Sequence, residues 1–298
     1  MTRTRETILV TGARGQLGAE LAVALVPFGN VVALDHAALD LADADAIART
    51  VRGLAPAWIV NAGAYTAVDR AETERERAFA VNARAPGVLA EEAKRAGAVL
   101  VHYSTDYVFD GAAHAPYREG DATNPQNVYG ASKLEGERAI AASGADALTL
   151  RTSWVYGLRG NNFLLTMRRL ASERDVLRVV DDQTGVPNWT RALANATAAL
   201  MAQGRARVAE RAGLYHLSAA GQTTWFAFAR AILGDVAKPR VVPISTAEYP
   251  TPARRPAYGV LASDRLREAF GVALPDWRES LAECLASAVE PPARNPVG

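Results

Sequence analysis

Cysteine, lysine and long apolar runs are scarce in this chain of 298 residues. The one cysteine, Cys284, excludes an intramolecular disulfide and fits the reducing cytoplasm, where we expect the protein to work. Because no run of 18 apolar residues occurs, we expect no transmembrane span. The first six residues are polar or charged apart from Met1 and are followed by only a short apolar strand, so we expect no signal peptide. The 33 basic and 32 acidic residues form no block of one sign, which argues against nucleic acid or a membrane surface as a partner. What remains is the composition of a soluble globular protein of the size of an enzyme.

Lysine makes up only three of the 33 basic residues, and one of the three, Lys133, follows Tyr129 by four positions. The composition predicts about 0.1 such pairs by chance. On a helix this spacing places both side chains on one face, where an ammonium can stabilise a phenolate and make the phenol a usable proton donor. Arginine is a poor substitute at such a site. The alternative interpretation is an ordinary surface pair.

Strand-like and helical patterns alternate over the first 150 residues. The expected strands cover residues 7–11, 31–34, 58–60, 99–103 and 147–150, and the expected helices cover residues 15–26, 43–52, 75–95 and 129–142. This order predicts an α/β fold of the Rossmann type, with a doubly wound parallel sheet and helices on both faces. Ligands of such sheets bind at the carboxyl ends of the strands.

After residue 154 this alternation becomes irregular. Helical patterns cover residues 163–172, 189–201 and 224–233, and short strands are expected at residues 177–180, 214–217 and 240–242. We therefore expect a dinucleotide-binding domain in residues 1–155 and a smaller α/β substrate-binding lobe, interleaved with it, in residues 156–290. The tail, residues 291–298, is expected to be disordered.

Three glycines, Gly12, Gly15 and Gly18, follow the first strand and enclose Gln16 and Leu17. The first permits a tight turn, the second lets the backbone approach a pyrophosphate, and the third lets the helix lie close to the sheet. The N-terminus of that helix offers N–H groups and a partial positive charge to the anion. The turn therefore predicts a dinucleotide cofactor.

Two charged residues bear on which cofactor is used. Asp35 ends the second strand, where a carboxylate can accept the ribose hydroxyls and favour NADH. Arg14, in the glycine turn, can instead pair with the 2′-phosphate of NADPH. We expect both NADPH and NADH to be used; the alternative for Asp35 is a simple turn residue.

Two further strand ends carry candidate cofactor contacts. Asp40 and Leu41 can meet the adenine edge, although Asp40 is equally suited to cap a helix. After the third strand come small residues that let a flat cofactor lie against the backbone. The alternative is that these residues only form a loop. These are Ala62, Gly63 and Ala64, followed by Tyr65.

Two sequence strings are more specific than the glycine turn. Residues 104–111 read Ser-Thr-Asp-Tyr-Val-Phe-Asp-Gly, and residues 64–69 read Ala-Tyr-Thr-Ala-Val-Asp. With the glycine turn and the tyrosine–lysine pair, the chain resembles the extended short-chain dehydrogenase/reductases and, within them, the dTDP-4-dehydrorhamnose reductase family. The resemblance covers at least residues 6–200. It implies NAD(P)H-dependent reduction of the 4-keto group of dTDP-4-dehydro-L-rhamnose to dTDP-L-rhamnose, so a dTDP-sugar is the expected substrate.

The resemblance also implies roles for single residues. Tyr129 would be the general acid, Lys133 would lower its pKa and hold the nicotinamide ribose, and Thr105 would orient the keto oxygen. The chemistry agrees, because a ketone that receives hydride becomes an alkoxide and needs a proton and a hydrogen-bond donor at once. The positions that match the sugar pocket of the family are Val68, Asp106, Tyr107 and Trp154. For both of these aromatic side chains the alternative is core packing.

Two other functions stay open at this point. One is a different sugar-nucleotide reductase or an epimerase of the same superfamily. The other is a non-catalytic regulatory subunit, similar to that of methionine adenosyltransferase. The presence of Tyr129, Lys133 and Thr105 argues against the second, because a regulatory subunit need not retain all three.

The resemblance raises the question of a metal, because some members of the family are dimers bridged by magnesium. Glu20 matches one of their acidic positions, but Arg191 stands where a second carboxylate would be expected. An arginine opposes the binding of a hard divalent cation, which needs oxygen ligands. We therefore expect no metal site, and either a monomer or a homodimer that forms without metal.

Overall fold

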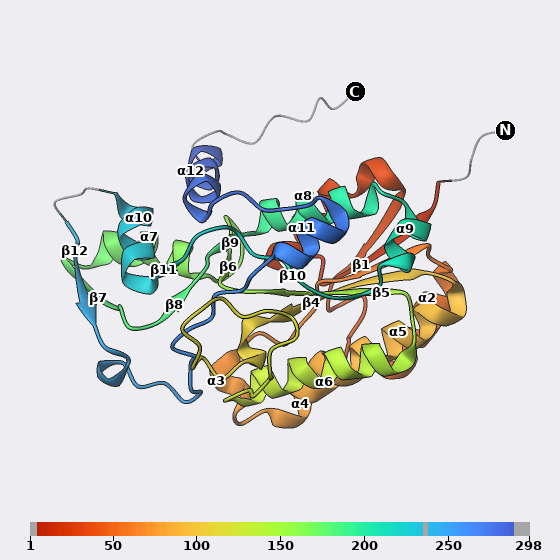
Figure 1. Ribbon diagram of the computed structural model, residues 1–298, viewed down its shortest axis with the longest axis horizontal. Helices are drawn as coiled ribbons and strands as arrows, with labels where there is room; N and C mark the ends of the chain where they lie inside the picture. The colour runs from red at the N-terminus through yellow and green to blue at the C-terminus, as the bar shows by residue number, and fades with distance from the viewer. Residues whose placement is uncertain (1–4, 235–237, 289–298) are drawn as a thin grey trace.

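A sheet of six parallel strands forms the centre of the computed structural model, which describes residues 5–234 and 238–288 (Figure 1). The predicted parallel α/β sheet is confirmed. In the order in which they pair, the strands are β10 (Gly213–His216), β5 (Ala147–Thr152), β4 (Val99–Thr105), β3 (Trp58–Asn61), β1 (Thr7–Thr11) and β2 (Asn30–Leu34).

Both faces of this sheet are buried under helices. Successive strand residues point to opposite sides, so each strand contributes side chains to two cores. Ile8 and Val10 belong to one core, and Leu9 between them belongs to another. Figure 1 shows α1, α8 and α9 on one face and α2, α5 and α6 on the other. Their bounds are α1 (Gln16–Ala24), α8 (Thr190–Met201), α9 (Arg205–Glu210), α2 (Ala44–Leu54), α5 (Ala85–Ala96) and α6 (Val128–Ser143). Each fully buried aliphatic side chain contributes about 1.5–3 kcal/mol, so the two cores fix the layers.

The order of the strands reverses at β1, which lies between β2 and β3. The chain leaves β1 toward β2 on one side and then returns to β3 on the other. The loops that follow β1 and β3 therefore diverge and leave space at the carboxyl ends of the strands, where ligands of such sheets bind. The glycine turn follows β1 at this position.

Several segments of the second half of the chain pack on this sheet. The strand β10 extends it by pairing with β5, and α8 packs along α1. Farther out, the parallel pair β7 (Val176–Val180) and β12 (Arg240–Ile244) packs against α10 (Trp225–Leu233). The predicted tail, residues 291–298, lies outside the described residues.

Most of the remaining elements are short. They are η1 (Val26–Phe28), α3 (Val68–Ala71), α4 (Arg75–Phe79), η2 (Ala80–Arg84), η3 (Asp106–Val108), β6 (Val155–Tyr156), α7 (Phe163–Glu173), β8 (Thr184–Gly185), β9 (Asn188–Trp189), β11 (Thr223–Thr224), η4 (Thr246–Glu248), α11 (Asp264–Phe270) and α12 (Trp277–Ser287).

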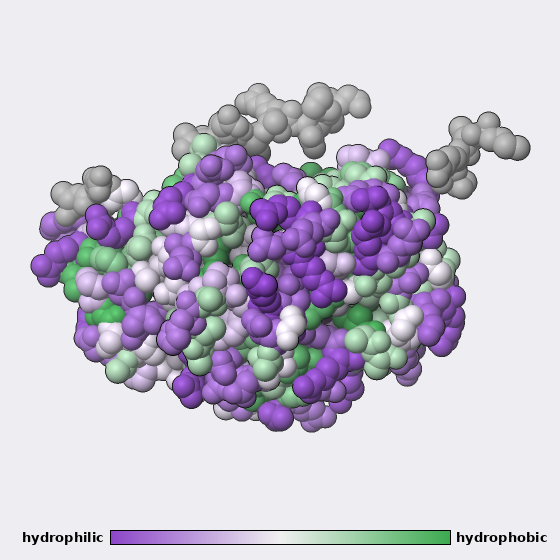
Figure 2. Space-filling view, viewed as in Figure 1, coloured by the Kyte–Doolittle hydropathy of each residue, from purple (hydrophilic) through white to green (hydrophobic). Residues whose placement is uncertain are grey.

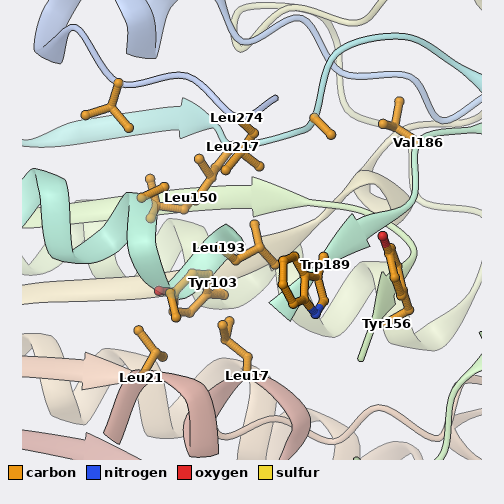
Figure 3. Close-up of a cluster of buried hydrophobic side chains, with 14 of the residues drawn as sticks. Leu17, Leu21, Tyr103, Leu150, Tyr156, Val186, Trp189, Leu193, Leu217 and Leu274 are labelled. Atoms are coloured by element: carbon orange, nitrogen blue, oxygen red, sulfur yellow. The ribbon is translucent and has the colours of Figure 1, made fainter. Parts of the chain in front are cut away.

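One core joins the sheet to the second half of the chain, as Figure 3 shows. Leu17 and Leu21 from α1 and Leu193 from α8 lie on one side of it, and Tyr156 and Trp189 continue it toward β6 and β9. Because these side chains form one cluster, the segment after β5 is held firmly against the strand ends.

The helix expected over residues 75–95 is interrupted. It consists of α4, a π-helical turn at η2, and α5. The cause is Pro86, which has no N–H to donate to the carbonyl of Asn82 four residues earlier. The N–H of Ala85 bonds instead to the carbonyl of Ala80, five residues back.

The surface is mixed in character. Figure 2 shows hydrophilic residues over most of one face, with apolar residues scattered between them. Among the described residues no helix is long and apolar enough to cross a membrane.

Candidate active site

The glycine turn is tight at Gly12, as expected, whereas Gly18 lies against the turn itself. Gly12 has φ +69°, in the region that favours glycine, and its carbonyl accepts a hydrogen bond of 2.8 Å from the N–H of Gly15. A Cβ on Gly18 would collide with that same carbonyl, so α1 begins directly against the turn. Gly15 is the N-cap of α1 and provides no side-chain cap. No side chain of the N-cap therefore competes for the first N–H groups of the helix.

The side chains of Gln16 and Leu17, between Gly15 and Gly18, have different surroundings. The side chain of Leu17 is buried in the core of Figure 3, which leaves only its backbone for a ligand. The amide of Gln16 is bound at its oxygen by Asn162, at 2.8 Å, and its nitrogen donates to the carbonyl of Asn161. This contact ties the turn to the loop before α7.

At the end of β2, Arg14 and Asp35 form an ion pair with 2.8 Å between Nε and Oδ2. The other oxygen of Asp35 accepts the N–H of Ala38, so Asp35 also has the turn role that was its alternative. Asp40 does not cap a helix: it accepts the N–H of Ala42, while Asp43 caps α2.

The loop after β3 lies against the glycine turn. A Cβ on Gly63 would come within 2.5 Å of the Leu41 side chain, and one on Gly12 would come within 2.7 Å of the Gly63 backbone. The structure thus brings together three candidate cofactor positions from three different loops. Ala62, Ala64 and Tyr65 in the same loop are partly exposed.

Asn82, on the π-helical turn, is a residue that sequence reasoning did not assign to the site. Its amide accepts the N–H of Tyr65 at 2.8 Å and donates to the carbonyl of Tyr65 and to the Ser132 hydroxyl, each at 3.0 Å. It therefore clamps the loop after β3 to α6. A Cβ on Gly136 would meet the Asn82 carbonyl, so α6 crosses where Pro86 leaves that carbonyl free.

Thr105 ends β4 and begins η3. Its hydroxyl donates to the carboxylate of Asp106 at 3.0 Å and accepts the N–H of Tyr107 at 3.2 Å. Asp106 is 2% exposed, and its second oxygen has no hydrogen-bond partner within the described residues. Burial raises the pKa of this carboxyl to about 7, against the hydrogen bond from Thr105, which lowers it.

The start of α6 brings Tyr129 to this strand end. Asn127 caps the helix by accepting the N–H of Gly130 at 2.7 Å. A Cβ on Gly130 would collide with the carbonyl of Tyr107, so only glycine allows this close approach. The rings of Tyr107 and Tyr129 meet edge to face, with centroids 5.6 Å apart.

The surroundings of Tyr129 favour the protonated phenol. Burial raises its pKa to about 12, and a side-chain hydrogen bond with Thr105 partly offsets the increase. The pKa is thus higher than that of a free phenol, whereas the assigned role of Lys133 is to lower it.

Lys133 lies one turn farther along α6 and is 1% exposed. Its Nζ donates to the carbonyl of Tyr103 at 2.5 Å and lies 3.2 Å from Nε2 of His102. Burial lowers the pKa of this ammonium to about 8, and the charge of Glu137 opposes the shift. His102 was not singled out from the sequence.

Trp154 lies beyond the end of β5 with φ +41°. Its ring stacks on Trp225 with centroids 3.5 Å apart and an angle of 10°, and it covers Gly185. Both indole side chains are partly exposed, so Trp154 is not a core residue in the usual sense. Trp225 is a third residue that sequence reasoning missed, after Asn82 and His102, because nothing near it in the sequence marks it. Val68, which starts α3, is also partly exposed.

The position considered for a metal is occupied by an ion pair. Arg191 Nε lies 3.1 Å from Glu20 Oε2. Within residues 5–234 and 238–288, no group of three or more His, Cys, Asp or Glu side chains is arranged to hold a metal ion.

The class that this fold and these strand ends define is the extended short-chain dehydrogenases/reductases. The chain also matches the family model described as the RmlD substrate binding domain over residues 6–290. The chain belongs to the dTDP-4-dehydrorhamnose reductase family.

The similarity to individual relatives extends over nearly the whole chain. The dTDP-4-dehydrorhamnose reductase of Burkholderia thailandensis is 50% identical over 93% of this chain and 97% of its own length. The reductase of Escherichia coli is 44% identical over 91% and 94%. The crystal structure of the Bacillus anthracis reductase in complex with NADP is 35% identical, covers 95% of this chain and all of its own, and has a TM-score of 0.87.

Proposed function

We propose that the chain reduces dTDP-4-dehydro-L-rhamnose to dTDP-L-rhamnose with NADPH or NADH. The observation that carries the proposal is the side-chain hydrogen bond between Tyr129 and Thr105 at the end of β4, on the same edge of the parallel sheet as the glycine turn after β1. A protonated phenol and a hydroxyl there can serve a keto oxygen together, one by giving a proton and one by orienting it. The relatives named as this reductase support the choice of substrate.

The cradle at the glycine turn fits a dinucleotide. Side chains at Gly12 or Gly18 would fill the space between the turn, the loop after β3 and the start of α1. The N–H groups at the start of α1 would hold the pyrophosphate, and Ala62, Gly63 and Ala64 would lie against the nicotinamide half. When bound, the cofactor supplies the hydride. Reduced cofactors of both kinds are proposed because Arg14 and Asp35 both lie at the adenosine end, and a similar structure holds NADP.

The residues of the chain handle the proton. Tyr129, with a pKa of about 12, holds its proton at neutral pH and releases it only to a stronger base such as a new alkoxide. The Lys133 ammonium would stabilise the phenolate left behind and bind the nicotinamide ribose. Thr105 would keep the oxygen in line with the phenol. These roles together form a proton-transfer site that needs no metal.

For the sugar, we propose contacts from Val68, Asp106, Tyr107 and Trp154. They come from three segments at the carboxyl end of the sheet. We also propose that residues 156–290 supply the lobe that covers the sugar nucleotide on the sheet of residues 1–155. A cytoplasmic location, and a monomer or a homodimer that forms without metal, complete the proposal.

A turnover assay tests the function. Purified protein with dTDP-4-dehydrorhamnose and either NADPH or NADH should consume the reduced cofactor and yield dTDP-L-rhamnose. A non-catalytic subunit would consume none, and an epimerase would change the sugar without net oxidation of the cofactor. Failure with both cofactors, in protein shown to be folded by its melting curve, would contradict the proposal. The UDP-linked keto-sugar is the matched control for the choice of nucleotide.

A further inference from the structure

Four buried polar side chains form a continuous chain of contacts beneath the candidate site. The Thr11 hydroxyl lies 2.6 Å from Oδ1 of Asn61, whose Nδ2 lies 2.9 Å from Nδ1 of His102. The other ring nitrogen of His102, Nε2, lies 3.2 Å from Nζ of Lys133. All four residues are at most 1% exposed. They link the end of β1, under the glycine turn, to the lysine of α6.

The contacts of Lys133 leave a specific role for the imidazole. An ammonium has three N–H donors and no acceptor. One donor is used by the Tyr103 carbonyl at 2.5 Å, and one must reach His102. The third is then free for the ribose that the proposed function places beside it. His102 can receive a hydrogen bond from the ammonium only if Nε2 carries no proton.

The identity of the neighbour at Nδ1 then decides the tautomer. A neutral imidazole that accepts at Nε2 carries its proton on Nδ1 and must donate it there. The oxygen of the Asn61 amide is the acceptor that can take it, with the amide nitrogen turned toward Thr11. The two orientations of an amide have the same shape, so the contact distances permit both. The structure has the opposite orientation, with Oδ1 toward Thr11 and Nδ2 toward His102. In that orientation Nε2 would donate to Lys133, and the lysine would have to be a neutral amine.

We propose that His102 is a positioning residue that, as the neutral Nδ1–H tautomer held by Asn61, accepts a hydrogen bond from the Lys133 ammonium and keeps it charged and aimed at the cofactor ribose. This inference rests on the proposed role of Lys133. It adds a residue that does not touch the reacting atoms and acts through the lysine. When Lys133 loses its proton, the direction of the hydrogen bonds along the four side chains reverses, and Nε2 of His102 becomes the donor.

The other charged groups near this lysine leave the acceptor role to His102. Glu137, on the same helix, carries charge toward Lys133 but is engaged by Arg151 at 2.6 and 2.9 Å and by Ser104 at 2.5 Å. Tyr129, one turn away on the same helix, is a protonated phenol. Burial and the charge of Lys133 hold the pKa of His102 well below its ordinary value, so the imidazole stays neutral.

A measurement on the wild-type protein tests the tautomer directly. The chain has four histidines, so ¹⁵N–¹H correlation of the imidazole rings gives a simple spectrum, and variants at the other three identify His102 by elimination. At pH 6.5 we expect a neutral ring whose proton is on Nδ1. We expect it to change to the Nε2–H form above about pH 8, as Lys133 loses its proton. An imidazolium, or an Nε2–H ring at pH 6.5, would overturn the proposal. This readout requires no turnover, so it is independent of the proposed reaction.

Two variants at this position separate positioning from packing. His102→Gln keeps an acceptor in the amide oxygen, and His102→Leu removes it. Losing an acceptor for a charged donor lowers the pKa of that donor, so His102→Leu should move the basic limb of the kcat profile down by about one pH unit. His102→Gln should stay close to the wild type. A purely structural defect would lower kcat equally at every pH and leave the limb in place, which would refute the role.

The matched control is the other fully buried histidine. His216 lies on β10, and its Nδ1 is 3.1 Å from the carbonyl of Ala262. His216→Gln should leave the basic limb unchanged. If it moved the limb as far as His102→Leu, the effect would belong to any buried imidazole and not to the contact with Lys133. If His102→Leu does not fold, the tautomer measurement and His102→Gln still decide the question.

Discussion

Arg14 Nε and Asp35 Oδ2 lie 2.8 Å apart and join the glycine turn to the end of β2. The guanidinium is 86% exposed, and the carboxylate is 18% exposed. Exposed ion pairs contribute about 0–1 kcal/mol, so a bound phosphate can compete for the arginine. Arg14, which would favour NADPH, and Asp35, which would favour NADH, are thus paired with each other in this structure.

Cofactor choice should therefore depend on Asp35. In Asp35→Ala, Arg14 is released to meet a 2′-phosphate and the carboxylate that repels it is gone. We expect the ratio of kcat/KM for NADPH to that for NADH to rise about tenfold, which is about 1.4 kcal/mol. Asp45→Ala, at an exposed carboxylate on α2, is the control and should leave the ratio unchanged. An unchanged ratio in Asp35→Ala would place Asp35 away from the adenosine ribose.

Tyr129→Phe removes the proposed proton donor and keeps the ring. Loss of a general acid costs about 10²–10⁴-fold in rate, so kcat should fall by that factor. The dissociation constant of the reduced cofactor, measured by fluorescence titration, should change little because the ring remains. Substantial residual turnover would assign the proton to another group, with the neighbouring Tyr107 the first to examine.

Lys133→Arg should also lose nearly all activity. The site is 1% exposed and shaped around a single nitrogen, so a planar guanidinium cannot occupy it without displacing its neighbours. The control is Lys94→Arg, at an exposed lysine whose Nζ donates to the carbonyl of Ser143 at 2.9 Å. Its rate should be that of the wild type. A largely active Lys133→Arg enzyme would show that the lysine has no chemical role.

Asp106 should make the stability of the fold depend on pH. Its folded carboxyl keeps the proton to about pH 7, while an unfolded aspartate loses it near the ordinary value of 3.8. The folded state therefore binds more protons between these pH values, and its free energy of unfolding falls as the pH rises through them. Asp106→Asn removes this term. Relative to the wild type, it should gain up to about 4 kcal/mol between pH 4 and pH 8 in urea unfolding.

Asp110→Asn is the control of opposite sign. The N–H of Ala112 and then the Tyr117 hydroxyl hold the pKa of the Asp110 carboxyl below its ordinary value. The wild type therefore gains stability relative to this variant as the pH rises through the ordinary value. If both variants behaved alike, the raised pKa of Asp106 would be wrong.

The parallel sheet and the glycine turn could be predicted because they depend on local signals. Buried strands are short apolar runs, and Gly12 is required by a positive φ at a strand end. The break in the helix over residues 75–95 was not predicted, although Pro86 marks it in the sequence. What could not be inferred from it was that the freed carbonyl of Asn82 receives α6 at Gly136, since that contact joins residues 54 positions apart.

The missed residues share one property, which is that their partners are distant in sequence. Trp225 stacks on Trp154, and His102 meets both Asn61 and Lys133. In the sequence His102 is one polar residue inside an apolar strand. The ordinary interpretation of such a residue is a buried histidine whose ring nitrogens are hydrogen-bonded and which has no role in function. Its significance appears only when β3, β4 and α6 are placed side by side.

Removal of divalent metal should leave the protein unchanged in rate and assembly. Glu20 is paired with Arg191 at 3.1 Å, so the carboxylate already has a cation within its own chain, and the guanidinium would repel a metal ion. The proton transfer proposed for Tyr129 and Thr105 requires no Lewis acid. We expect EDTA to leave kcat and the sedimentation coefficient as they were. A fall in activity or mass that magnesium restores would contradict this. Arg191→Glu, which places two carboxylates together, should create a dependence on magnesium if the position can bind one.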